Sequence, residues 1–304
     1  MQVVDTADAE PMTVAGPSGP ATVKRRVSRF FSARPNVRLA SLLSAPALWL
    51  VVLYLGSLIA LFLTSLYRLN EDGTAITEKI GARNYRELLD KPVYRDIVVR
   101  TIGVAALVTV IDICLALPIA FFIAKIARPR VRTLMITAVL VPLWGSYLVK
   151  AFAWRALLGS PGGVIDRTIG TSPGYGLPAL VIVLSYLWLP YMIVPIYAGL
   201  DRLPDSLLEA SNDLGAGFWY TFRSVVVPML LPAIIAGSVF TFALSMGDYI
   251  AVALVGGPTQ MIGSVVYANF ASDLPFAAAF ATVPILVMIV YLLGIRRTGA
   301  LDNL

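Results

Sequence analysis

Histidine is absent from this sequence of 304 residues, and cysteine occurs once, at Cys114. Without these residues the chain has no Ser-His catalytic triad, no Cys/His metal site and no disulfide framework. Charged residues are scarce too, at 14% of the chain, where a soluble domain carries about 25%. The G-x-x-x-x-G-K-[ST] phosphate loop is also missing. We therefore expect no catalytic residue, no metal and no nucleotide site, and a chain suited to a membrane.

Long apolar runs stand in place of the missing charges, and hydrophobic residues make up 58% of the chain. A run of about 20 apolar residues crosses the ~30 Å hydrocarbon core as a helix, because lipid offers the backbone no hydrogen-bond partner. Six stretches meet this length: about 45–66, 98–124, 133–152, 178–200, 229–247 and 275–295. The sequence therefore predicts an all-α integral membrane protein with six transmembrane helices.

Four prolines lie inside these stretches, and they predict kinked or locally broken helices at Pro118, Pro190, Pro195 and Pro284.

The basic residues indicate the orientation. If the amino terminus is cytoplasmic, fourteen of the 24 Lys and Arg fall on the cytoplasmic side: Lys24, Arg25, Arg26, Arg29, Arg34, Arg38, Lys125, Arg128, Arg130, Arg132, Arg202, Arg223, Arg296 and Arg297. Basic residues favour the inside, so we expect a multi-pass protein of the cytoplasmic membrane with both termini cytoplasmic. Because they lie in short clusters between spans, the basic pI reflects this topology and predicts no nucleic-acid partner.

The two ends of the chain differ from its middle. Residues 1–43 are polar and end in a basic cluster, which favours a disordered cytoplasmic tail. A cleaved signal peptide is disfavoured, because the apolar run 45–66 is longer than a signal h-region. Residues 44–297 then form one transmembrane domain, and 298–304 form a short cytoplasmic tail.

Residues 201–228 form the longest connection between spans on the predicted cytoplasmic side. Ser206 and Glu209 have the spacing of a capping box, and Gly215 is placed to end a helix of two to three turns. Three residues share one face of this helix, with Leu208 and Ser211 alongside: Leu207, Ala210 and Leu214. That face is covered by the protein's own helices, by the headgroup layer, or by another protein.

The sequence Glu209-Ala210-Ser211, followed by Gly215, Val227-Pro228 and Pro232, resembles the EAA loop of the membrane subunits of ATP-binding-cassette (ABC) importers. In that family the loop is a coupling helix that docks in a cleft of the cytoplasmic ATPase. The resemblance implies this role for eight residues: Ser206, Leu207, Leu208, Glu209, Ala210, Ser211, Leu214 and Gly215. Ser211 departs from the second alanine of the motif, a change of one small residue for another that we expect docking to tolerate.

The resemblance extends over roughly residues 40–297. The stretches GARNYRELLDKPVYRDIVVRTI (81–102), VPLWGSYLVKAFAWRALLGSPGGVID (141–166) and MGDYIAVALVGGPTQMIGSVVYANFASDLPFAAAFA (246–281) are similar to the spermidine/putrescine branch of these permeases. This implies the type I importer fold, a polyamine-like substrate, and no cofactor in this chain.

The same resemblance implies partners: a cytoplasmic ATPase pair that holds ATP and Mg, a second homologous permease and an extracytoplasmic binding protein, all in contact with a chain embedded in lipid. Another small solute, such as an amino acid or an opine, is the alternative substrate.

Acidic and aromatic residues near the outer ends of spans are candidates for the substrate pathway. Asp112 lies within the second span, as a cation contact or as an interhelical hydrogen-bonding group. Asp248 and Tyr249 could hold an ammonium group, or Asp248 could be an interfacial carboxylate. Trp144 and Tyr147 join them as candidates, although aromatic anchoring at the membrane interface also explains such residues.

Two other classes of function fit the sequence poorly. A membrane-embedded enzyme would need a metal motif or paired carboxylates, and Asp112 is the only acid deep within a span. A secondary transporter would show inverted repeats and more ionisable residues within its spans.

Overall fold

The computed structural model describes residues 43–44, 46–70, 76–77, 80–159 and 162–296. The chain divides into two units after Ile59. In the first unit the described residues from Pro46 onward form the start of the helical span Pro46–Leu66, with a π-helical turn η1 (Val51–Leu55) and the first residues of α3 (Gly56–Leu66), which continues into the second unit. The predicted tails, 1–43 and 298–304, lie outside the described residues except for Leu43.

The second unit is built from helices of two lengths. The long ones are α5 (Pro92–Phe121), α6 (Pro129–Trp144), α7 (Tyr147–Leu158), α9 (Leu177–Arg202), α13 (Leu231–Gly247) and α16 (Leu274–Arg296). The short ones are α4 (Arg83–Asp90), α8 (Val164–Ile169), α10 (Asp205–Asp213), α11 (Phe218–Thr221), α12 (Val227–Met229), α14 (Ile250–Val255) and α15 (Ile262–Asn269). Two π-helical turns, η2 (Phe122–Ile126) and η3 (Phe222–Val226), continue α5 and α11.

A short hairpin precedes α4. Strand β1 (Arg68–Leu69) pairs antiparallel with β2 (Ile76–Thr77). The Asn84 side-chain amide donates hydrogen bonds to the carbonyls of Ser65 and Tyr67, at 2.9 and 2.8 Å. These bonds satisfy backbone acceptors where α3 ends and tie the hairpin to α4.

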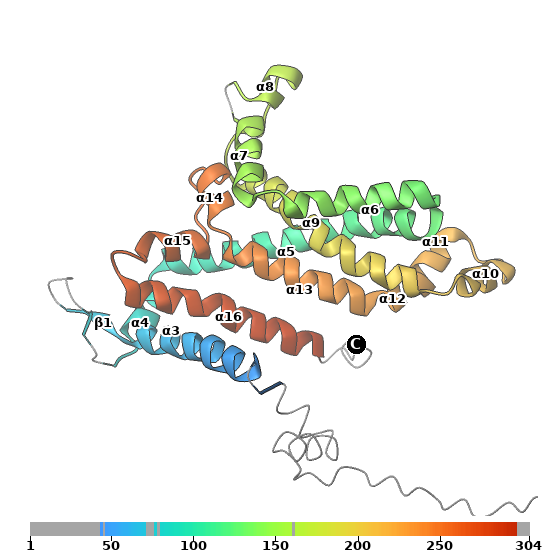
Figure 1. Ribbon diagram of the computed structural model, residues 1–304. Helices are drawn as coiled ribbons and strands as arrows, with labels where there is room; N and C mark the ends of the chain where they lie inside the picture. Colours follow the sequence, from blue (N-terminus) through green and yellow to red (C-terminus); the bar gives the residue numbers. More distant parts are fainter. Residues whose placement is uncertain (1–42, 45, 71–75, 78–79, 160–161, 297–304) are drawn as a thin grey trace, which may run out of the picture. The chain divides into compact units, whose positions relative to one another are not determined.

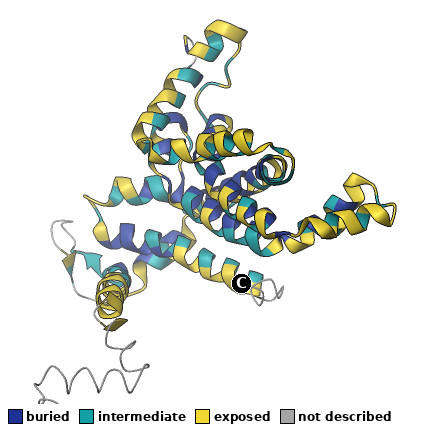
Figure 2. Cartoon of the chain, turned by 45° about the vertical axis from the view of Figure 1, so that its right-hand side comes forward, coloured by how far each residue is buried: buried dark blue, intermediate teal, exposed yellow. Residues whose placement is uncertain are grey.

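Helices α5, α9 and α13 pack side by side and form the centre of this unit (Figures 1 and 2). Their buried side chains include Val108, Leu184 and Met246. Helix α13 approaches α9 closely at Gly237, where an added Cβ would lie 2.7 Å from the Met192 sulfur. Close packing of small residues is what holds helices together in lipid, where burying apolar side chains gains little.

The predicted spans are present, but two of the six are bent. Among the described residues, four single helices are long and apolar enough to cross a membrane, and up to six spans result if each bent pair counts as one. The stretch 133–152 was expected to be one helix; instead α6 ends at Trp144 and α7 leaves it at 98°. The stretch 229–247 is likewise preceded by a 68° bend between Phe218–Met229 and α13.

Both bends have local causes. Gly145 and Ser146 adopt extended conformations, which end α6, and the Lys150 ammonium donates to the Pro142 carbonyl at 3.0 Å. At the other bend, Leu230 stands between Pro228 and Pro232, and proline cannot donate to the helix before it.

Of the kinks or breaks predicted at Pro118, Pro190, Pro195 and Pro284, none is a full break, because each of these prolines lies inside a helix that continues past it. Helix α5 changes to the π-helical turn η2 shortly after Pro118. Neighbouring helices in a bundle support the backbone at such positions.

The helices alternate in direction, so the connections gather at two ends (Figure 1). Helix α10, the turn between η2 and α6, and the C-terminal end of α16 lie at one end, while α4, α14 and α15 lie at the other. The basic turn and the predicted coupling segment therefore share one end of the molecule.

Candidate functional site

Helix α10 is a separate element of nine residues that joins α9 to α11. Its C-terminal end is closed by two backbone hydrogen bonds: the Ala216 N–H donates to the Ser211 carbonyl at 3.1 Å, and the Gly215 N–H to the Asn212 carbonyl at 2.8 Å. Gly215 has a φ of 77°. This is the Schellman arrangement, which needs a left-handed residue and so favours glycine. The predicted length of the helix and the predicted role of Gly215 are both confirmed.

The predicted capping box is wrong. Pro204, not Ser206, stands at the N-cap, and no side chain caps the helix. Proline disfavours the helical conformation in the residue before it, and Leu203 is extended. Pro204 is extended too, at φ −63° and ψ 134°, so the helix begins at Asp205 and Ser206 lies inside it. Glu209 is thereby exposed, without a hydrogen bond or ion pair to any residue that the structure describes.

One side of α10 rests on the chain itself. Leu208 packs against the cluster at the C-terminal ends of α5 and α9, and the hydroxyls of Ser211 and Thr221 are 2.8 Å apart. A cavity of about 290 Å³ lies beside this contact, lined by Phe121, Leu208, Asn212, Phe218, Thr221, Phe222 and Val226. Leu208 and Ser211 therefore attach α10 to the rest of the chain.

The neighbouring face of α10 is largely uncovered. Leu207 is 38% exposed and Leu214 is 88% exposed, and Ala210 is exposed between them (Figure 2). Within the part of the chain that the structure describes, the other helices leave these three residues exposed. An exposed apolar face on a short, fixed helix is typical of a binding surface.

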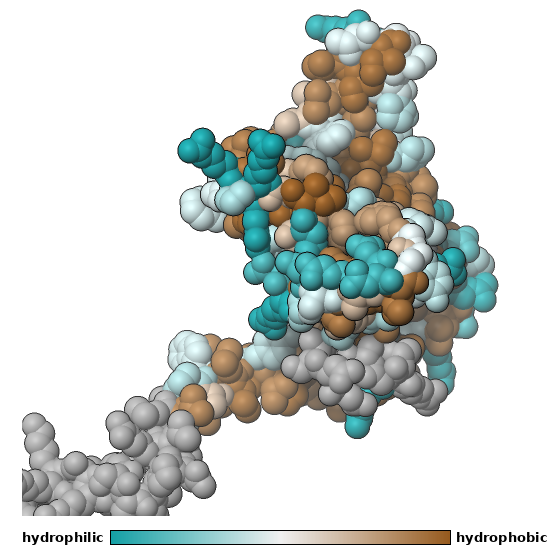
Figure 3. All heavy atoms as spheres, turned by 90° about the vertical axis from the view of Figure 1, so that its right-hand side faces the viewer, coloured by the Kyte–Doolittle hydropathy of each residue, from teal (hydrophilic) through white to brown (hydrophobic). Residues whose placement is uncertain are grey.

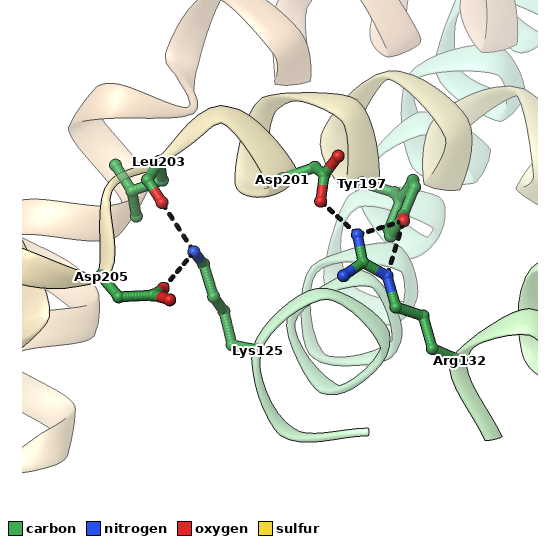
Figure 4. Close-up of polar contacts among 6 residues, drawn as sticks. All are labelled: Lys125, Arg132, Tyr197, Asp201, Leu203 and Asp205. Atoms are coloured by element: carbon green, nitrogen blue, oxygen red, sulfur yellow. Dashed lines mark hydrogen bonds and ion pairs between the residues drawn. The ribbon is translucent and has the colours of Figure 1, made fainter. Parts of the chain in front are cut away.

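Polar side chains surround α10 at this end of the molecule (Figure 3). Lys125 of η2 donates to the Leu203 carbonyl and to the Asp205 carboxylate, both at 2.6 Å (Figure 4). Arg132 of α6 donates to the Tyr197 hydroxyl, at 2.9 Å from Nε and 2.7 Å from Nη2, and pairs with Asp201. From the sequence, Lys125 and Arg132 were identified only as basic residues that indicate the orientation in the membrane.

A second cluster lies toward the other end, where α13 gives way to α14. The Tyr147 hydroxyl donates to one oxygen of Asp248 at 2.5 Å, and the Ala251 N–H donates to the other at 2.8 Å. Trp188 stacks on Tyr147 with ring centroids 5.9 Å apart. Tyr147, Trp188 and Asp248, with Tyr249, line a cavity of about 290 Å³.

Asp248 lies just beyond the end of α13 and is 7% exposed. Burial raises the pKa of its carboxyl, while the hydrogen bonds from Tyr147 and Ala251 act in the opposite direction. A carboxylate held by two donors beside aromatic faces can accept a cation, because the ring faces and the carboxylate both attract positive charge.

The other predicted pathway residues lie elsewhere. Trp144 is 91% exposed at the end of α6. Asp112 is fully buried on α5 beside Ser185, without a hydrogen bond of standard geometry to any residue that the structure describes. Trp188, which looks from the sequence like a membrane anchor, belongs instead to the Tyr147–Asp248 cluster. No local pattern in the sequence could have assigned it there.

Residues 97–298 match the family described as the binding-protein-dependent transport system inner membrane component. The chain is 38% identical over 312 aligned positions to the inner membrane ABC transporter permease protein YdcU of Escherichia coli K12, covering 95% of this chain and 97% of the relative. It is 31% identical to the spermidine/putrescine transport system permease protein PotB of the same organism, covering 84% and 95%.

Among solved structures, the chain is similar to a subunit of a bacterial ABC transporter that imports the acidic polysaccharide alginate. The TM-score is 0.70 at 16% identity, and the match covers 90% of this chain and 98% of the other. At this identity the likeness concerns the fold, which is the type I importer permease fold that the resemblance implied. The chain is therefore a multi-pass transport subunit of the inner membrane, and it belongs to the inner membrane components of binding-protein-dependent ABC importers, in the branch that holds the spermidine/putrescine permeases.

Proposed function

We propose that the uncovered face of α10 docks on a cytoplasmic ATPase, and that this ATPase drives the import of a small organic cation through the permease. The observation that carries this proposal is the exposed set Leu207, Ala210 and Leu214 on a helix whose end is fixed by Gly215. An unpaired Glu209 on the same helix adds a charge for recognition. Because docking buries this face, it needs no cover from the chain itself.

The energy comes from outside this chain. ATP and Mg belong to a pair of ATPase subunits, and one coupling helix per permease implies a second, homologous permease. An extracytoplasmic binding protein delivers the substrate. A related solved structure supports this part, since it holds a bacterial alginate ABC transporter in complex with a periplasmic protein bound to an alginate pentasaccharide.

The same arrangement fixes the proposed topology. With α10 in the cytoplasm, both termini are cytoplasmic. ATP binding draws the two coupling helices together, and the membrane helices then exchange an inward-facing for an outward-facing cavity. Coupling of this kind is reciprocal, so loaded binding protein stimulates hydrolysis.

A polyamine-like cation is the proposed substrate. Asp248, Tyr147, Trp188 and Tyr249 offer one carboxylate and three aromatic rings around a cavity near the outer end of the bundle. The names of the spermidine/putrescine relatives point the same way. An ammonium group would gain both an ion pair and cation–π contact in such a cavity.

The docking proposal is tested in the complete importer, reconstituted with its ATPase, second permease and binding protein. Glu209→Lys reverses an exposed charge on α10, and we expect it to abolish stimulation of ATP hydrolysis by the binding protein while the complex still inserts. Glu209→Gln keeps the shape and removes only the charge, so we expect an intermediate loss. Full stimulation with Glu209→Lys would refute the docking role.

A topology measurement gives an independent test. In a Cys114→Ala background, a cysteine at position 212 replaces Asn212, which is exposed on α10. An impermeant thiol reagent should label it only after cells are opened. Labelling in intact cells would place α10 outside and end the proposal.

The substrate is tested on the binding protein, by ligand-induced thermal stabilisation across polyamines, amino acids and sugars. Stabilisation by polyamines alone supports the proposal. A shift with an amino acid or another solute instead identifies the alternative substrate.

A further inference from the structure

A basic side chain from another part of the fold binds the junction between α9 and α10. Lys125 reaches it from the last turn of η2, 78 residues away in sequence from Leu203. Its ammonium bridges the Leu203 carbonyl, where α9 ends, and Asp205, the first residue of α10. A cation at one helix C-terminus and an acid at the next helix N-terminus are both favourable with the helix dipoles. The Lys125 side chain is 10% exposed, so water competes little for its donors.

A second polar contact is made by a residue of the next helix, α6. Arg132, in the first turn of α6, donates two hydrogen bonds to Tyr197 and pairs with Asp201 one turn on along α9 (Figure 4). A planar guanidinium bound through two nitrogens holds its partner in a defined orientation. Lys125 and Arg132 therefore stand on either side of the tight turn from η2 to α6. Lys125 holds the junction that leads into α10, and Arg132 holds the last two turns of α9 before that junction.

These contacts matter more because α6 has little other attachment. None of its residues is buried, whereas α5, α9 and α13 are buried along much of their length. Helix α6 continues through the 98° bend into α7, which carries Tyr147 of the acid–aromatic cavity. The two basic side chains thus connect the base of α10 to the helix that leads toward that cavity.

We propose that Lys125 and Arg132 are positioning residues that lock the α5–α6 turn to the α9–α10 junction, so that α10 and α6 move as one body when the ATPase acts. This rests on the proposed docking of α10. It adds the route by which a displacement at the ATPase reaches the acid–aromatic cavity, through α6 and α7. A purely topological role for these basic residues predicts no such joint movement.

Joint movement is measured by the distance between two spin labels in the complete importer. In the Cys114→Ala background, cysteines replace Asn212 on α10 and Leu134 on α6, both exposed. The distance distribution is recorded without nucleotide and after trapping with ATP and vanadate. With the contacts of Lys125 and Arg132 intact, we expect a narrow distance distribution whose mean is the same in the two states.

Three variants then remove or weaken the contacts of Lys125 and Arg132. Lys125→Met and Arg132→Met each remove a charge and its donors, and Asp205→Asn weakens the same pair from a position whose side chain is 75% exposed, where misfolding is not expected. We expect each to broaden the distance distribution, and Lys125→Met to lower stimulated ATP hydrolysis about five-fold, the lower end of typical coupling between sites. Lys125→Arg keeps the charge and should restore both readings.

Arg130→Met is the matched control. Arg130 lies in the same first turn of α6 and is exposed, without an ion pair or side-chain hydrogen bond to the part of the chain that the structure describes. It should leave the distance distribution narrow.

Three results would overturn the inference. The first is a mean label distance that shifts on trapping in the protein with Lys125 and Arg132 intact. The others are a distance distribution that stays narrow in Lys125→Met and Asp205→Asn, or one that broadens equally in Arg130→Met. A failure of the docking proposal looks different. There Glu209→Lys would retain stimulation, whereas the label distances would still report whether α10 and α6 are locked together.

Discussion

The end of α10 depends on one backbone conformation that can be perturbed cleanly. Gly215 has a φ of 77°, and a Cβ added there would meet nothing within 4 Å. Gly215→Ala therefore introduces no clash, and its whole effect is the strain of a left-handed alanine. That strain is about 1–2 kcal/mol, which changes a local equilibrium by a factor of about 5–30.

Hydrogen exchange of the α10 amides measures this equilibrium. Few buried contacts hold α10, so its last turn should open locally without unfolding the bundle. We expect the amides of Leu214, Gly215 and Ala216 to exchange faster in Gly215→Ala by about that factor, 5–30. Stimulated ATP hydrolysis should fall in the same variant, because an opened α10 loses the surface that docks.

Gly217→Ala is the matched control, two residues on. Its φ of −69° and ψ of 157° suit any residue, and an added Cβ there also meets nothing within 4 Å. Equal exchange in Gly215→Ala and Gly217→Ala would refute the reasoning. So would faster exchange in Gly215→Ala together with full stimulation, since the fixed helix end would then be irrelevant to coupling.

Three further substitutions test other contacts. Asp248→Asn should raise the concentration of a cationic substrate needed for half-maximal uptake, and an unchanged value would remove Asp248 from the pathway. Thr101→Val leaves the buried Ile262 N–H without its 3.0 Å acceptor, which should lower stability by about 1–3 kcal/mol in thermal unfolding of the detergent-solubilised protein. Gly263→Ala places a Cβ 2.7 Å from the Gly247 carbonyl oxygen, so it should lower the midpoint of the same transition; an unchanged midpoint would mean that the backbone yields freely there.

Matched controls exist for the last two. Thr133→Val removes a hydroxyl that is exposed on α6 and bonds only within its own helix, to Pro129, at 3.0 Å. Gly294→Ala adds a methyl group to α16 where nothing lies within 4 Å. Both should leave the unfolding midpoint unchanged.

Local features of the structure were the ones that sequence could predict. Gly215 ends α10 because a left-handed residue is required there, and the length of the helix follows from the distance between Pro204 and that glycine. The capping box failed because two local signals competed: Pro204 favours an extended Leu203, so the helix starts directly after the proline and Ser206 falls inside it. The bend at Gly145 was missed because an average of hydropathy over a window of residues passes through a break without registering it.

Contacts between residues far apart in the chain could not be predicted from the sequence. Tyr147 and Asp248 are 101 residues apart, and Lys125 and Asp205 are 80 apart. Each of these residues has an ordinary local explanation, as a membrane anchor, a span-end carboxylate or a topology signal. Only packing of α5, α9 and α13 brings them together, and periodicity within one helix says nothing about which face meets which neighbour.

The shortness of α6 has a consequence for the lipid around this subunit. Its 16 residues rise about 24 Å, whereas the 35 residues from Pro92 to Ile126 rise about 52 Å. A hydrocarbon layer of ~30 Å is thicker than α6 is long. Thinning the bilayer to match costs fractions of a kcal/mol per Å, and this cost falls as the acyl chains become shorter. Bilayer thickness therefore becomes a variable that tunes how freely α6 and α7 can tilt.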